Sequence, residues 1–170
     1  MITPAYCQLL ARYGRWMNER LYACVRTMGD DERKRDRGAF FGSIHRTLSH
    51  LVWADSIWLS RFTGGTYAER AWGADLFDDF AQLSAARDAT DTGILDWAGR
   101  LDQAWLDSTL EYRAASDTRL RQLPAWIAAA HLFNHATHHR GQLTTLMKQA
   151  GVDPGVTDLP FMPGVTRILD

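Results

Sequence analysis

The stretch His131-Leu-Phe-Asn-His-Ala-Thr-His-His-Arg-Gly-Gln-Leu143 decides both the predicted fold and the predicted site. It lies inside the most clearly delimited helix of the sequence, which begins at Pro124 and ends at Gly151. Apolar residues recur at helical spacing along it. The stretch also holds four of the 6 histidines of the chain: His131, His135, His138 and His139.

Three more helical segments precede this one. Apolar residues at helical spacing predict them from Pro4 to Gly29, from Phe40 to the Gly64-Gly65 pair, and from Leu76 to Leu110, the last with a bend or interruption around Thr92-Gly93. Glu111 to Gln122 has no helical period, so we expect an irregular crossing segment or a short hairpin there. The charged stretch from Asp30 to Arg37 is expected to be a solvated connector, and the tail from Val152 to Asp170 an ordered coil laid over the bundle.

Four helical segments without a sustained strand pattern or a repeat period predict an all-α fold. A chain of 170 residues fits a single domain over 1–170. We therefore expect a four-helix bundle, in which the long region from Leu76 to Gln122 allows a crossover connection.

Composition restricts the possible function. The chain has 19 basic and 20 acidic residues, which gives none of the positive charge that nucleic-acid binding needs. No secretion leader and no apolar run of about 20 residues is visible, so we expect a soluble, cytoplasmic protein without membrane contact. Cys7 and Cys24 fall in one predicted helix about 25 Å apart, so they cannot bridge each other within it, and we expect core thiols.

All histidines outside the stretch 131–143 lie on the second predicted helix, at His45 and His50. Residues four apart on a helix share a face about 6 Å apart, so His135 can chelate one ion together with either His131 or His139. His131 and His139 point about 80° apart and lie about 12 Å apart along the axis, so they cannot both bind that ion. His45 and His50 differ by about 140° around their axis, so only one of them faces the bundle centre.

Three histidine ligands leave coordination positions open for water or substrate, which is typical of catalytic sites, whereas structural zinc sites are closed by four ligands. A lone histidine on a helix is more often a surface or core residue satisfied by one hydrogen bond. We prefer that structural interpretation for His45 and His138. For the group, confinement of every histidine to two helices with chelating spacing favours a metal site.

The stretch 131–143 resembles the signature of the DinB family, the DinB/YfiT-like putative metalloenzymes. The segments Trp16-Met-Asn-Glu-Arg-Leu21, Ser43-Ile-His-Arg-Thr-Leu-Ser-His-Leu-Val-Trp-Ala-Asp-Ser-Ile-Trp58 and Asp158-Leu-Pro160 resemble that family too, in its order. The resemblance implies a four-helix bundle, commonly a homodimer, with a divalent ion held by one histidine of the second helix and an H-x-x-x-H pair of the last. Carried over, the ligands are His50, His135 and His139.

Other polar residues surround these positions. We expect His131, Asn134 and Gln142 to support the ligands or to line the pocket, since ligand imidazoles usually donate their other N–H to an acceptor. Asp55 and Asn18 fall in motif positions, but Asp55 is about 140° from His50 on its helix, so we expect a supporting or structural role for both. Arg140 could pair with an anionic group of the substrate or with Asp55, and we favour the structural ion pair with Asp55.

Relatives within the superfamily include mycothiol-dependent maleylpyruvate isomerase and bacillithiol transferases, and others resemble hydrolases. The resemblance therefore implies a metal-dependent enzyme, a thiol S-transferase or a hydrolase, that acts on a small molecule in stress or detoxification. Zinc or nickel suits three imidazoles, and a low-molecular-weight thiol is the expected cosubstrate. The alternative is a stress-induced metal-binding protein without turnover. The family's name does not indicate a translesion polymerase, which needs several domains and a cluster of carboxylates.

Overall fold

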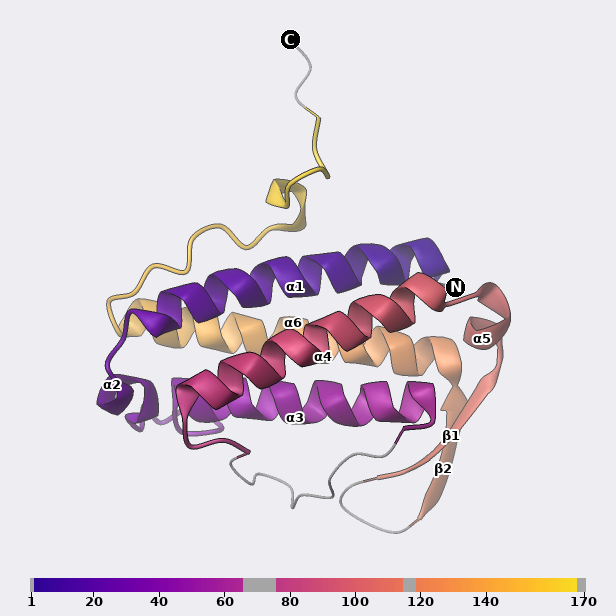
Figure 1. The fold of residues 1–170 in the computed structure, drawn as a ribbon, viewed down its shortest axis with the longest axis horizontal. Coiled ribbons are helices and arrows are strands. Elements are labelled where there is room, and N and C mark those ends of the chain that lie inside the picture. The colour runs from indigo at the N-terminus through magenta and orange to yellow at the C-terminus, as the bar shows by residue number, and fades with distance from the viewer. Residues whose placement is uncertain (1, 66–75, 115–118, 168–170) are drawn as a thin grey trace.

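The structure, a computed structural model, describes residues 2–65, 76–114 and 119–167. Its four long helices are α1 (Pro4–Arg26), α3 (Ile44–Thr63), α4 (Phe80–Arg100) and α6 (Ala125–Gln149). The shorter elements are α2 (Asp30–Lys34), α5 (Gln103–Asp107), the strands β1 (Thr109–Arg113) and β2 (Leu120–Pro124), and the 3-10 helix η1 (Leu159–Phe161). The predicted all-α class is confirmed, with one small antiparallel hairpin added (Figure 1).

Side-chain caps explain where three of the long helices begin. The hydroxyl of Thr3 accepts a hydrogen bond from the backbone N–H of Tyr6, and that of Ser43 accepts one from Arg46. The Asp79 carboxylate does the same for Gln82. Each cap satisfies an N–H that the first helical turn leaves unpaired. Gly64 ends α3 with a left-handed φ of 65°, a conformation that suits glycine.

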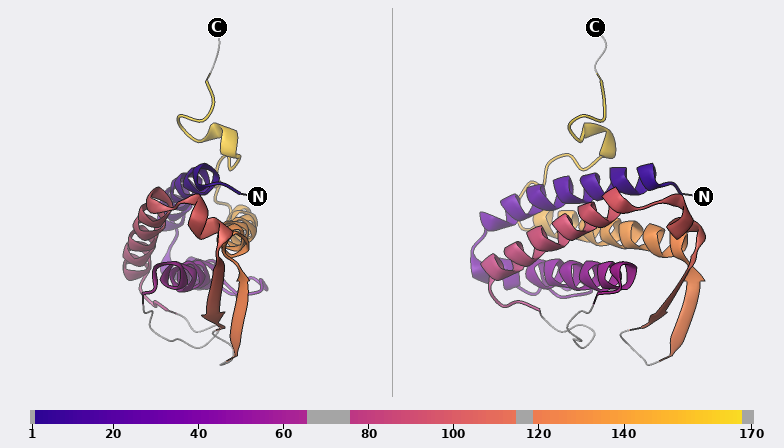
Figure 2. Two further views of the ribbon diagram at one scale, coloured as in Figure 1. Left: turned by 90° about the vertical axis from the view of Figure 1, so that its right-hand side faces the viewer. Right: turned by 45° about the vertical axis from the view of Figure 1, so that its right-hand side comes forward.

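The long helices form a bundle in which each packs on two neighbours, with α1 diagonal to α3 and α4 diagonal to α6 (Figure 2). Phe62 stacks on Trp97, and His45 contacts the carbonyl of Phe77, so α3 and α4 run in the same direction. Residues 64–79 therefore join opposite ends of the bundle. The sequence placed the crossover connection in the region from Leu76 to Gln122. In the structure the crossover comes before α4, and most of it precedes Leu76.

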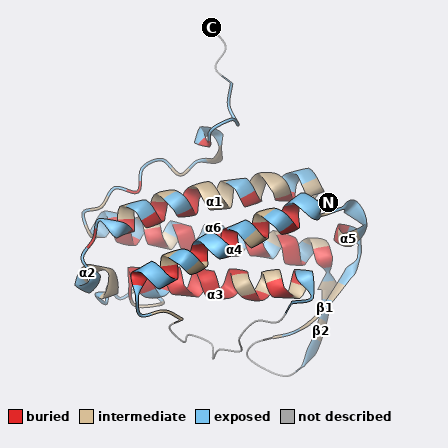
Figure 3. Cartoon of the chain, viewed as in Figure 1, coloured by how far each residue is buried: buried red, intermediate tan, exposed pale blue. Residues whose placement is uncertain are grey.

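Two large hydrophobic clusters fill most of the bundle, and Trp53, Ala54 and Ile57 form a third, small one. Of the large clusters, one gathers around Met17, Leu48 and Leu83, and the other around Phe62, Trp97 and Leu132. Along α3 and α4 the charged side chains of Asp55, Arg87 and Asp91 fall between these two clusters, and all three are buried. Buried residues run along most of α3, which makes it the most enclosed of the helices in view in Figure 3.

Several predicted boundaries need correction. The charged connector contains the short helix α2, although its surface is solvated as expected. The third predicted helix is shorter than expected, and α4 passes through Thr92-Gly93 without interruption. Of the two alternatives for Glu111 to Gln122, the hairpin is right, with Glu111 paired to Gln122. Pro124 ends β2 and occupies the N-cap position of α6 without a capping hydrogen bond, so the helix itself begins at Ala125.

Only the first part of the tail lies on the bundle. The Tyr13 hydroxyl donates to the carbonyl of Thr157 at 2.6 Å, and Lys148 pairs with Asp153 at 3.2 Å. Beyond Thr157 the described chain leads away from the helices (Figure 1), so the expectation of a tail laid over the bundle is wrong for that part. Among the described residues, no helix combines the length and the apolar character needed to span a membrane.

Candidate metal centre

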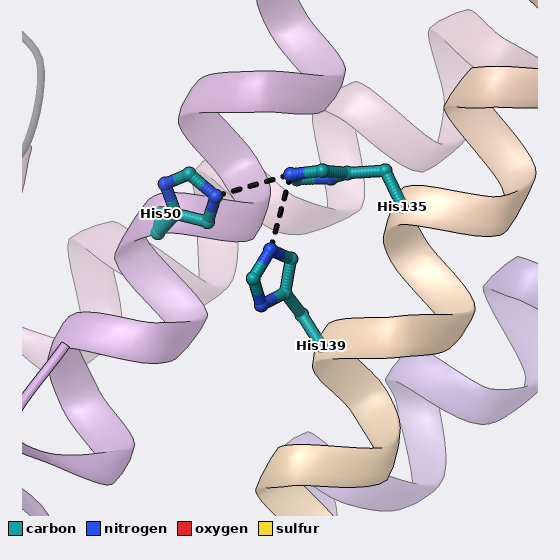
Figure 4. Close-up of side chains that lie close together, drawn as sticks. All are labelled: His50, His135 and His139. Atoms are coloured by element: carbon teal, nitrogen blue, oxygen red, sulfur yellow. Dashed lines mark hydrogen bonds between the residues drawn. The ribbon is translucent and has the colours of Figure 1, made fainter. Parts of the chain in front are cut away.

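Three histidines meet between α3 and α6 (Figure 4). His50 comes from the second turn of α3, and His135 and His139 lie one turn apart on α6, which runs antiparallel to α3. One nitrogen of each ring lies within 4.8 Å of those of the other two, so the group could hold a metal ion. The structure thus brings together the three residues that the family resemblance selected, and leaves out His45 and His131.

Two of the three nitrogen separations fit a metal ion closely. His50 Nε2 lies 3.2 Å from His135 Nε2, and His139 Nε2 lies 3.1 Å from the same atom. For metal–nitrogen bonds of about 2.0–2.1 Å, ligands separated by tetrahedral or right angles lie about 2.8–3.4 Å apart. Hydrogen bonding alone accounts less well for this arrangement, because one Nε2–H on His135 can be donated to only one of the other two rings.

Gln142 fixes the tautomer of one ring. Its Oε1 lies 2.7 Å from His139 Nδ1, and its Nε2 lies 3.3 Å from His138 Nε2. An amide oxygen only accepts, so His139 donates from Nδ1, and its Nε2 keeps a lone pair directed at the site. His135 differs, because its buried Nδ1 has no hydrogen-bond partner among the described residues.

Burial keeps these imidazoles neutral. Removal from water, and to a lesser extent the neighbouring histidines, lowers the pKa of His50 to about 4 and that of His135 to about 3. The pKa of His139 is lowered by burial too. Neutral imidazole is the form that binds metal ions, so all three rings are available as ligands at neutral pH.

Aromatic rings border the histidines. Phe41 stacks on His50 with ring centroids 4.0 Å apart and lies 5.4 Å from His139. On the other side Trp58 contacts His131 at 4.9 Å, and His131 lies 5.6 Å from His135. The sequence placed Phe41 in the second predicted helix, from Phe40 on, but α3 begins at Ile44 and Phe41 precedes it in an irregular turn. Helical periodicity therefore could not show that its ring faces the site.

The predicted supporting residues separate into three groups. Gln142 contacts a ligand candidate, and His131 lies beside His135 as part of the rim. Asn134 is exposed, and its side chain makes no hydrogen bond with any described residue. Asn18 and Asp55 lie away from the three nitrogens, in a buried ionic network with α4.

Two further predictions concern single side chains. The predicted ion pair between Arg140 and Asp55 is wrong. Asp55 pairs with Arg87 of α4 instead, whose Nη1 lies 2.7 Å from Asp55 Oδ2. Helix periodicity could not show this, since the competing cation comes from another element. His45 lies apart from the site and contacts the Phe77 carbonyl at 2.7 Å, which agrees with a structural role.

Comparisons with known proteins agree with this fold. The chain is 22% identical over 158 residues to Protein DinB of Bacillus subtilis, covering 88% of each sequence. A crystal structure of a DinB-like protein from Bacillus cereus superposes with a TM-score of 0.60 at 23% identity, covering 84% of this chain and 91% of that one. The model of the DinB family matches residues 1–167. With a match over nearly its whole length, this chain belongs to the DinB family.

Proposed function

We propose that the protein is a metal-dependent enzyme that acts on a small molecule, either transferring a thiol to it or hydrolysing it. The observation that carries the proposal is the convergence of three neutral imidazoles without a fourth ligand. Within the described residues, no other histidine, cysteine or carboxylate joins the group of His50, His135 and His139. Three protein ligands leave room on an ion for an exchangeable water or thiol.

The chain's own residues have distinct tasks in this proposal. His50, His135 and His139 would hold the ion, and Gln142 keeps His139 in the tautomer that presents Nε2. A divalent ion bound there would lower the pKa of coordinated water or thiol, which supplies a nucleophile at neutral pH. Phe41 covers one face of His50 and restricts the approach of water from that side.

The rim indicates the character of the substrate. Phe41 and Trp58 flank the histidines on two sides, and Trp53 lies 5.7 Å from His50. Aromatic walls around a few polar groups are typical of sites for small, partly apolar molecules. We therefore propose an apolar electrophile as substrate, with zinc or nickel as the ion and a low-molecular-weight thiol as cosubstrate of the transferase reaction.

Cobalt substitution tests the proposal. Protein purified without a nickel column would be stripped of metal, titrated with Co²⁺, and followed by its visible absorption before and after addition of 2-mercaptoethanol. We expect one Co²⁺ per chain and a new sulfur-to-cobalt charge-transfer band with the thiol. His135→Ala should lose Co²⁺ binding, whereas His138→Ala, which removes an exposed histidine of the same helix, should keep it.

The outcomes separate the competing functions. Cobalt binding with a thiol-dependent band supports thiol transfer, and binding without that band but with ester hydrolysis supports a hydrolase. A bound ion that exchanges neither water nor thiol indicates the non-catalytic metal-binding protein. Wild-type protein that binds no more Co²⁺ than His135→Ala would refute the metal site.

A further inference from the structure

A buried ionic network joins α1, α3 and α4 apart from the histidine site. Asn18 of α1 donates to Asp91 of α4 at 2.9 Å, and Arg87 of α4 contacts both Asp55 of α3 and Asp91. Arg140 of α6 lies at its edge. These side chains are at most 6% exposed, so water at the surface cannot compensate for partners they lack.

Asp55 is satisfied on one oxygen only. Its Oδ2 accepts a hydrogen bond from Arg87 Nη1 at 2.7 Å. Its Oδ1 is buried and accepts no hydrogen bond from any described residue. A buried carboxylate oxygen without a donor is costly, so a native structure generally supplies one.

Arg140, in turn, has N–H donors that need acceptors. It is 6% exposed, and its Nη2 donates to Thr137 Oγ1 at 3.3 Å, while its guanidinium carbon lies 5.3 Å from the Tyr13 ring. No carboxylate of the described chain lies within ion-pair distance of it. A guanidinium carries five N–H donors, so several of them need acceptors.

Asp55 and Arg140 both line one small cavity. It has a volume of about 20 Å³ and is lined by Asp55, Asn18, Asp91 and Arg140, with Gly14 and apolar side chains around them. A cavity needs about 10–15 Å³ to hold a water molecule, and the water needs two to four polar partners. The charges of Asp55 and Asp91 balance those of Arg87 and Arg140, so the cavity suits a neutral ligand and not an ion.

We propose that one water molecule is bound in this cavity, donating to Asp55 Oδ1 and accepting from Arg140. The water links α3 to α6 one residue away from His139, so it contributes to holding that turn of α6 in place. The link needs no metal, so it goes beyond the proposed function and is testable on metal-free protein.

A crystal structure that resolves ordered water provides the direct test. We expect one density peak within hydrogen-bonding distance of both Asp55 Oδ1 and Arg140 in the metal-free wild-type protein. In solution, ¹⁷O relaxation dispersion should detect a corresponding long-lived internal water. An Arg140 side chain that pairs directly with Asp55 and closes the cavity would overturn the proposal, as would a cavity without density.

Two glycine variants give an independent energetic test. A Cβ on Gly14 would meet only Arg140 Nη1, at 3.6 Å, and would extend from the cavity wall, whereas one on Gly141 meets nothing within 4 Å. Both Gly→Ala changes gain helix propensity. With the water in place, Gly14→Ala crowds it, so its melting temperature should rise less than that of Gly141→Ala, or fall. An equal or larger rise for Gly14→Ala would mean a dry cavity and contradict the proposal.

Discussion

One amide side chain contacts two neighbouring histidine rings on α6. Gln142 accepts from His139 Nδ1 at 2.7 Å and approaches His138 Nε2 at 3.3 Å. Gln142→Leu removes the acceptor and leaves the tautomer of His139 unspecified. We expect metal affinity to fall about 10–100-fold, the range typical for loss of a hydrogen bond to a ligand histidine. Competition with a chromophoric chelator measures it, and Gln149→Leu, at an exposed position of the same helix, should bind as wild type.

The two cysteines should differ in reactivity. Cys7 is fully buried, and burial raises the pKa of its thiol from 9.0 to about 11, whereas Cys24 is half-buried. The thiolate is the reactive form. Iodoacetamide at pH 8 should therefore modify Cys24 in the folded protein and Cys7 only after unfolding, as mass spectrometry of the peptides would show. Equal labelling of both in native protein would contradict the packing of Cys7.

The same pKa shift sets a dependence of stability on pH. Because the folded pKa of Cys7 lies above the unfolded one, the unfolded chain loses its thiol proton first as the pH rises. The contribution of Cys7 is complete below about pH 9 and is lost progressively between about pH 9 and 11. Urea unfolding across this range should show a steeper loss for wild type than for Cys7→Ala.

At the scale of elements, the ionic network fastens α4 to α1 and α3. Arg87 is 2% exposed, and burial alone would lower its pKa, but Asp55 and Asp91 outweigh that effect and raise it. Nη1 makes a hydrogen bond to Asp55, whereas the 2.8 Å contact of Nη2 with Asp91 is an ion pair whose N–H is poorly aligned. Arg87→Met would leave two buried carboxylates without their cation.

We expect Arg87→Met to lower the free energy of unfolding by about 3–5 kcal/mol, the usual cost of breaking a buried ion pair from one side. Arg15 forms the surface pair with Glu19 on α1, and both side chains are more than 40% exposed. Arg15→Met should cost about 0–1 kcal/mol. Urea unfolding of both variants measures the difference. Similar losses would mean that the network stabilises no more than a surface pair.

Periodicity predicted the long helices because each buries a continuous apolar face. It missed α2 because five residues with Asp30, Asp31 and Glu32 in the first turn show no apolar period. It suggested a bend at Gly93, yet α4 is continuous there, and a Cβ on Gly93 would lie 2.6 Å from Leu59. That glycine serves close packing of α4 on α3, a relation between elements that local sequence does not express.

The sequence predicted part of the candidate site, as it predicted part of the fold. Spacing placed His135 with one of its two neighbours on α6, and the family resemblance selected His139 and His50, which do meet in the structure. Their role as metal ligands stays a prediction. Phe41 and the partner of Asp55 could not be predicted, because both depend on how separate elements come together.

For the whole molecule, the histidine site joins α3 to α6, two helices that adjoin along much of their length. An ion bound by His50, His135 and His139 would therefore add a link within the folded bundle that the unfolded chain cannot form in the same geometry. Any ligand that prefers the folded state stabilises it by mass action. A free ion concentration of about 100 times its Kd should add about 2.7 kcal/mol.

This gain predicts a thermal shift. For a domain of this size, about 1 kcal/mol corresponds to about 2–4 °C, so zinc should raise the melting temperature of stripped protein by about 5–10 °C, and a chelator should reverse the rise. His50→Ala should abolish the shift, because only one helix then supplies ligands. His138→Ala should retain it, since that exposed ring lies outside the group. A full shift in His50→Ala would place the bound ion on α6 alone, and α3 would then contribute no ligand to it.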